Sequence, residues 1–73
     1  MASLEVLSMD SKVRNGLGML GYNPKGESIG IGTPSHAGRF FGVSFEDGMK
    51  IRDRAKTMSP SERVDYITRL SKK

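Results

Sequence analysis

Three glycines in residues 16–21 follow the spacing G-x-G-x-x-G of the dinucleotide-binding fingerprint. In that fingerprint the glycines form a turn after a strand, and the next helix points its N-terminus at a pyrophosphate. Here Pro24 follows closely, and Asn23–Gly26 has the composition of a type I turn. No helix can begin where the phosphate needs one. The pattern therefore predicts a glycine-rich strand entering a hairpin, and no cofactor.

Other residues whose types suit catalysis or metal binding lack the partners that such chemistry requires. His36 is the single histidine, and Ser35 beside it points away from it on an extended loop, with no acid placed to orient the imidazole. The chain has no cysteine, and Glu46 and Asp47 stand without the rest of a calcium loop. We therefore expect that the protein is not an enzyme, and that it has no catalytic residue, no metal site and no small-molecule substrate.

The remaining chemistry is positive charge. Twelve Lys and Arg against eight Asp and Glu give a net charge of +4 and a pI near 9.8, which favours acidic protein surfaces or nucleic acid as partners. The densest basic segment supplies our candidate contacts, although a solvated surface would give the same pattern: Lys50, Arg52, Arg54 and Lys56. Phe40, beside Arg39, is a further candidate contact, since strand alternation would turn Phe41 into the core.

The elements expected to position these residues form an α+β fold, with a small antiparallel sheet in the N-terminal two thirds. Residues 39–45 have the clearest strand pattern, because Phe41, Val43 and Phe45 alternate onto one face. Val13, Leu17 and Leu20 have helical spacing, but Gly16 and Gly18 argue against more than one helical turn there. The expected strands are Ser3–Met9, Leu17–Tyr22, Glu27–Gly32 and Arg39–Phe45.

One or two C-terminal helices should pack on this sheet. Residues 46–58 fit a helix better than a strand, although Met49–Lys56 also alternates with all four basic residues on one face. Ser59, Pro60 and Glu62 form a capping box that begins a helix over residues 60–70. The apolar stripe of that helix should cover Phe41, Val43 and Phe45; it consists of Val64, Ile67 and Leu70.

Length and composition predict one small domain, residues 1–73, with mobile termini. Such a chain buries a small core, so a binding partner is the remaining source of order. No apolar run reaches the length of a membrane span, and the N-terminus lacks the pattern of a signal peptide. We therefore expect a cytoplasmic protein that does not bind membranes.

The first predicted strand is short and lies next to a chain end. An edge strand with unpaired backbone groups can accept an extended segment of another protein. In this prediction the side-chain anchors of the contact are Leu4, Val6 and Leu7.

The predicted helices over residues 46–58 and 60–70 also suggest a helix-turn-helix. Their basic residues, however, lie on both flanks of the apolar stripes, and Arg63 points into the second stripe. Neither helix offers Asn or Gln to read adenine. A sequence-tolerant module that contacts DNA or RNA phosphates therefore stays the alternative function.

Taken whole, the chain resembles the small transcription regulators of Xanthomonas bacteriophages. The resemblance rests on its length, on the opening MASLEVLSMDSK and on the ending FFGVSFEDGMKIRDRAKTMSPSERVDYITRL. It implies a protein that binds subunits of the host RNA polymerase near the RNA exit channel, inhibits promoter-specific initiation and promotes antitermination. Contact with nascent RNA or DNA phosphates is compatible with that role.

Overall fold

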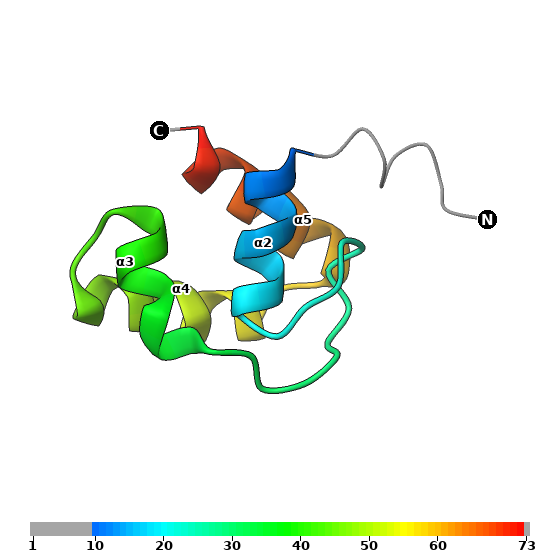
Figure 1. Cartoon of the computed structure of the whole chain (residues 1–73). Helices are drawn as coiled ribbons and strands as arrows, with labels where there is room; N and C mark the ends of the chain where they lie inside the picture. Colours follow the sequence, from blue (N-terminus) through cyan, green and yellow to red (C-terminus); the bar gives the residue numbers. More distant parts are fainter. Residues whose placement is uncertain (1–9, 73) are drawn as a thin grey trace.

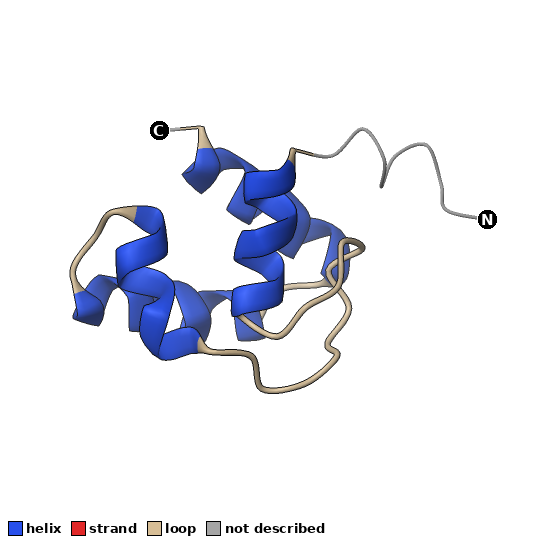
Figure 2. Ribbon diagram, in the orientation of Figure 1, coloured by secondary structure: helices blue, strands red, loops and turns tan. Residues whose placement is uncertain are grey.

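The computed structural model describes residues 10–72, which form helices joined by loops (Figures 1 and 2). The elements in chain order are α2 (Ser11–Met19), the short 3₁₀ helix η1 (Pro34–His36), α3 (Ala37–Phe41), α4 (Phe45–Lys56) and α5 (Pro60–Ser71). Within these residues the β-structure is a single antiparallel bridge between Tyr22 and Ser28. The predicted α+β fold with a sheet is therefore wrong, because the domain is all-helical.

Helix α2 occupies a region for which the sequence predicts no more than one helical turn. Asp10 caps it by accepting a hydrogen bond from the Lys12 backbone N–H, 2.8 Å away, and Val13 and Leu17 are buried on one face. A side chain at Gly16 would crowd the ring of Phe41, so this glycine lets α2 approach its neighbours closely. Burial on that face outweighs the glycine penalty of about 1 kcal/mol per residue.

The expected hairpin of Leu17–Tyr22 with Glu27–Gly32 is reduced to its turn. The backbone N–H of Gly26 donates to the carbonyl of Asn23, 2.8 Å away, which confirms a turn at this point. The Asn23 side chain also accepts from the backbone N–H groups of Lys25 and Glu27, at 2.9 Å each. Beyond this turn the two segments share a single bridge, between Tyr22 and Ser28, and otherwise form a loop. The two predicted strands are therefore wrong.

The predicted strand Arg39–Phe45 is wrong as well. Helix α3 ends at Phe41, Gly42 follows in the left-handed conformation (φ 72°), and Phe45 begins α4. Val43 and Phe45 are 41% and 61% exposed, so they do not form the core face that strand alternation predicted. Phe41 is half-buried against the core.

The two predicted C-terminal helices are confirmed, and each begins at the capping serine that the sequence indicates. Ser44 accepts from the backbone N–H of Asp47 and begins α4, so residues 46–58 do form a helix, which the structure bounds at Phe45–Lys56. At α5, Ser59 Oγ accepts from the Glu62 backbone N–H (3.4 Å), and the Glu62 carboxylate accepts from the Ser59 backbone N–H (3.0 Å).

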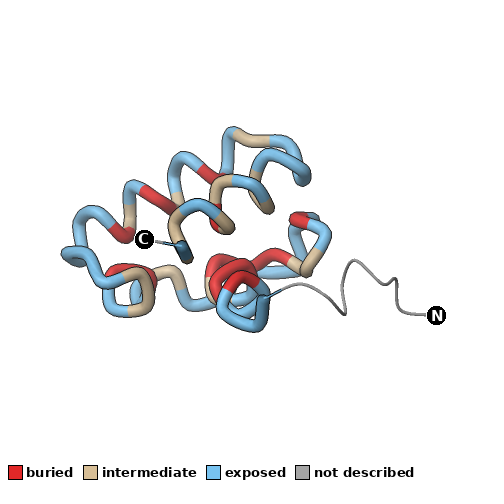
Figure 3. The backbone as a smooth tube through the Cα atoms, turned by 90° about the horizontal axis from the view of Figure 1, so that it is seen from above, coloured by how far each residue is buried: buried red, intermediate tan, exposed pale blue. Residues whose placement is uncertain are grey.

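The core lies between the helices, on the sides that face one another (Figure 3). Helix α2 packs against α5, while α3 packs against α4. Leu17 and Ile67 are the largest fully buried side chains, and Val64 and Leu70 pack partly buried around them. The apolar stripe of α5 therefore covers α2 rather than a sheet.

Candidate functional site

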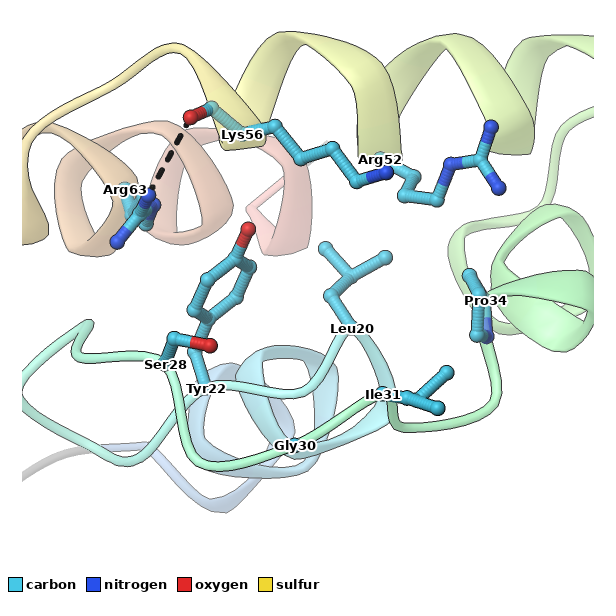
Figure 4. A pocket seen from close by; sticks show the side chains of 9 residues that line it. All are labelled: Leu20, Tyr22, Ser28, Gly30, Ile31, Pro34, Arg52, Lys56 and Arg63. Carbon is cyan, nitrogen blue, oxygen red and sulfur yellow. Dashed lines mark hydrogen bonds between the residues drawn. The ribbon is translucent and has the colours of Figure 1, made fainter.

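A pocket of about 360 Å³ lies between α4 and the loop that joins α2 to η1 (Figure 4). We call it the basic groove, because the residues that line it include three basic side chains and no acidic one. They are Leu20, Tyr22, Ser28, Gly30, Ile31, Pro34, Arg52, Lys56 and Arg63.

Arg63 builds one end of the basic groove. Its guanidinium donates to the carbonyls of Ala55 (2.7 Å) and Lys56 (3.4 Å) at the end of α4, and to the carbonyl of Gly26 (2.9 Å) in the loop. The same group lies 4.4 Å above the ring centre of Tyr22, a cation–π contact. Arg63 thus ties α4, α5 and the loop together, and each of its three side-chain nitrogens donates to a backbone carbonyl.

The two other basic residues of the groove differ in how far their charge is compensated. Arg52 donates through Nε and Nη2 to one carboxylate oxygen of Asp53, at 3.0 and 2.8 Å. The exposed Lys56 has no carboxylate within 4 Å among residues 10–72, and its side chain extends along α4 in the direction of Arg52 (Figure 4). Lys56 is therefore the main uncompensated charge of the groove.

The opposite wall of the groove is aliphatic. Ile31 is 86% exposed although it lines the pocket, and Pro34 and Leu20 lie on the same side (Figure 4). Tyr22 is buried, and Arg63 covers one face of its ring, so the groove offers no aromatic platform on which a nucleobase could stack. A negatively charged group that carries aliphatic surface fits this lining.

The structure divides the predicted basic contacts between two sides of α4. Arg52 and Lys56 line the groove, whereas Lys50 and Arg54 do not. Lys50 lies 3.9 Å from the carboxylate of Asp47, one turn earlier on the exposed surface. The helical period separates the four residues that a strand would have placed on one face.

Of the predicted apolar contacts, the structure describes Phe40. Phe40 is half-buried and packs edge-on against Phe41, with ring centres 5.0 Å apart, outside the groove. Leu4, Val6 and Leu7 lie outside the described residues.

The residues considered for catalysis or metal binding are not brought into a cluster. Ser35 and His36 are exposed in η1, and Glu46 and Asp47 occupy the first turn of α4. Within residues 10–72, no three His, Cys, Asp or Glu side chains come close enough to hold a metal ion.

Sequence reasoning missed the loop side of the groove, namely Leu20, Tyr22, Ile31 and Pro34. Residues 29–32 alternate isoleucine and glycine, a pattern that predicts a strand. The available signal was that a glycine-rich strand has little to hold its isoleucines in a core. Arg63 also gave a signal, because an arginine within an apolar stripe requires acceptors such as free carbonyls.

A second surface is formed where α3 meets α4. The three residues 42–44 join these helices, and Gly42 supplies the left-handed turn. A side chain at Gly48 would collide with the backbone N of Gly38, so the two helices cross in direct backbone contact. This arrangement has the parts of a helix-turn-helix. The pair α4 and α5, which the sequence suggested for that motif, is joined through the Arg63 side chain rather than by close backbone packing.

The first turn of α4 would be the reading end of such a motif. It carries Phe45, 61% exposed, followed by the exposed carboxylates of Glu46 and Asp47. Carboxylates at this place repel phosphates, which weakens the comparison with DNA-binding helices.

The chain matches no known protein family, no curated protein and no solved structure. No helix among residues 10–72 has the length and apolar character that crossing a membrane requires.

Proposed function

We propose that this chain is a non-enzymatic phage transcription regulator that binds host RNA polymerase, inhibits promoter-specific initiation and promotes antitermination. The resemblance to small regulators of Xanthomonas bacteriophages supports the choice of partner. Under this proposal the protein acts in the cytoplasm of the host bacterium.

One observation carries the proposal: the basic groove combines the uncompensated charge of Lys56 with the exposed side chain of Ile31. An exposed isoleucine that lies across a pocket from a free ammonium group favours a protein partner, which can cover the first and pair with the second. The net charge of +4 favours an acidic surface on that partner.

The test is capture of purified host RNA polymerase by the tagged chain after nuclease has removed bridging nucleic acid. We expect retention of the polymerase, together with fewer promoter-specific transcripts and more read-through products when the chain is added to transcription reactions. An unretained polymerase with unchanged transcript patterns would contradict the proposal.

A nucleic-acid-binding module is the second candidate function. The backbone contact of Gly38 with Gly48 and the turn at Gly42 favour it, because they give α3 and α4 the arrangement of a helix-turn-helix. Titration of mixed-sequence duplex DNA at several salt concentrations separates the two functions. A phosphate binder loses affinity steeply as salt rises, with a slope of about −0.9 per phosphate contact. We expect weak DNA binding, and polymerase binding that persists where DNA binding has been lost.

A further inference from the structure

We infer that the basic groove binds an acidic segment of the partner protein in which a carboxylate side chain pairs with Lys56 and a neighbouring aliphatic side chain packs on Ile31. This inference rests on the proposed function and adds the chemistry of the segment that the groove recognises.

The charge of the groove selects a carboxylate. Arg52 is partly compensated by Asp53, and each side-chain nitrogen of Arg63 donates to a backbone carbonyl. Lys56 is left with no carboxylate within 4 Å among the described residues. An ammonium group at the rim of a pocket steers an acidic partner into place and sets the salt dependence of its association.

The aliphatic wall selects a side chain of the same kind. Ile31 is 86% exposed, and Pro34 is half-buried on the same wall of the pocket. Covering an exposed isoleucine removes apolar surface from water, which adds affinity that salt does not weaken. Since charge and aliphatic surface share one groove, one short segment can contact both.

A protein segment fits the groove better than RNA or DNA does. Single-stranded nucleic acid is held by aromatic faces on which bases stack. The groove contains one aromatic ring, Tyr22, which is 6% exposed and covered by Arg63 on one face. Phosphates alone would also leave Ile31 in water.

The first experiment measures the affinity of nuclease-treated host RNA polymerase for the full chain and two pairs of variants. Lys56→Glu is matched by Lys12→Glu, which makes the same charge change on α2. Ile31→Ser is matched by Ile29→Ser, since Ile29 is 67% exposed on the same loop but does not line the groove. We expect each groove variant to weaken binding roughly tenfold or more. Each control should stay within about twofold of the parent chain.

The outcomes separate the inference from the proposed function. If the polymerase binds the parent chain and all four variants equally, the groove inference is overturned and the proposed function stands. If the polymerase does not bind the parent chain, the proposed function fails, and the groove is tested directly in the second experiment.

The second experiment is an amide NMR titration of the full chain with a short glutamate-rich peptide containing one leucine. The control peptide has glutamine in place of every glutamate. We expect saturable shifts at residues 31, 52 and 56 with the acidic peptide but not with the control peptide. These shifts should be lost in Lys56→Glu. Shifts spread evenly over all lysines, or equal shifts with the neutral peptide, would overturn the inference. Displacement of the acidic peptide by a thymidine oligonucleotide would show a phosphate site instead.

Discussion

Arg63 stands in the apolar stripe of α5, where helical periodicity calls for a hydrophobic side chain. Its three carbonyl acceptors explain the exception. Two of them, Ala55 and Lys56, lie in the last turn of α4, where carbonyls lack the regular helical donor four residues on, and the third is Gly26 in the loop. The planar guanidinium reaches α4 and the loop at once, which the single ammonium of lysine does not.

We therefore expect Arg63→Lys to lower the free energy of unfolding by about 1–3 kcal/mol, although it keeps the charge. Arg69→Lys is the matched control, because Arg69 is an exposed residue of the same helix. Urea unfolding followed by circular dichroism gives the comparison. Equal midpoints for the two variants would show that the carbonyl contacts of Arg63 add nothing to stability.

Glu62 gives a second prediction at this scale, which concerns pH. Hydrogen bonds from the backbone and side chain of Ser59 lower the pKa of Glu62 below its ordinary value of 4.5. A carboxyl with a lowered folded-state pKa adds stability above its unfolded pKa, and that stability is lost as pH falls through the folded pKa. Glu62→Gln should remove this part of the acid-induced loss of stability.

The measurement for Glu62 is the difference in urea midpoint between about pH 7 and about pH 3, in the parent chain and in Glu62→Gln. We expect a smaller difference in the variant. Most of the change should be a lower urea midpoint of the variant at neutral pH, where Glu62 of the parent chain is ionised. An unchanged difference would mean that the carboxylate of Glu62 is not held by the cap in solution.

At the scale of elements, the start signals of α4 and α5 could be predicted from sequence because each depends on residues three apart. Ser44 with Asp47 and Ser59 with Glu62 are local patterns, and the structure contains both caps. Helices α2 and α3 could not be predicted in this way. The glycines of α2 disfavour a helix locally, and the phenylalanines of α3 favour a strand. Contacts with residues far along the chain outweigh both preferences.

Gly16 shows why local rules failed. Its neighbours are Phe40, Phe41 and Ile67, and no local pattern predicts that contact. The same distinction between local patterns and long-range contacts explains why only part of the groove could be predicted. Arg52 and Lys56 come from a basic segment visible in the sequence, whereas Ile31 and Tyr22 reach the groove through the loop that the structure reveals.

The crossing of α3 and α4 gives a prediction at this scale. Alanine at Gly48 would place its Cβ on the backbone N of Gly38, whereas a Cβ at Gly18 meets nothing within 4 Å. We expect Gly48→Ala to lower the free energy of unfolding by about 1–3 kcal/mol through overpacking. Gly18→Ala should raise it by about 0.5–1 kcal/mol, because alanine favours a helix interior over glycine.

Thermal unfolding of both glycine variants tests this pair. Opposite shifts of Tm are the expected result. If both alanines stabilise the protein, the two helices do not cross in backbone contact, and the helix-turn-helix arrangement is lost with it.

At the scale of the whole molecule, the domain depends on a core of few side chains. Ile67 of α5 and Leu17 of α2 are the two largest fully buried side chains, and these two helices pack against each other. Ile67→Ala should lower the free energy of unfolding by about 2–5 kcal/mol, a large fraction of the stability of a small domain. Loss of the helical circular dichroism signal, or a strongly reduced urea midpoint, is the expected observation. A variant with parental stability would contradict the described packing of α5 on α2.

The distribution of charge over the whole molecule explains why we propose one groove as the binding site. The net charge of +4 is distributed over the whole chain, and the basic groove is the place where a free ammonium, an exposed isoleucine and a hollow coincide. Apart from Arg52, Lys56 and Arg63, the basic residues that the structure describes do not line this pocket.

The most direct test of the basic groove as the polymerase-binding site is site-specific photocrosslinking in a complex of host RNA polymerase, DNA template and nascent RNA. A photoreactive phenylalanine replaces Ile31 in one variant and Phe45, at the start of α4, in another. We expect the probe at residue 31 to crosslink to an acidic segment of the polymerase, and the probe at residue 45 to crosslink to neither DNA nor RNA. Crosslinks from residue 45 to DNA or RNA, with none from residue 31 to the polymerase, would overturn the assignment of the basic groove as the polymerase-binding site.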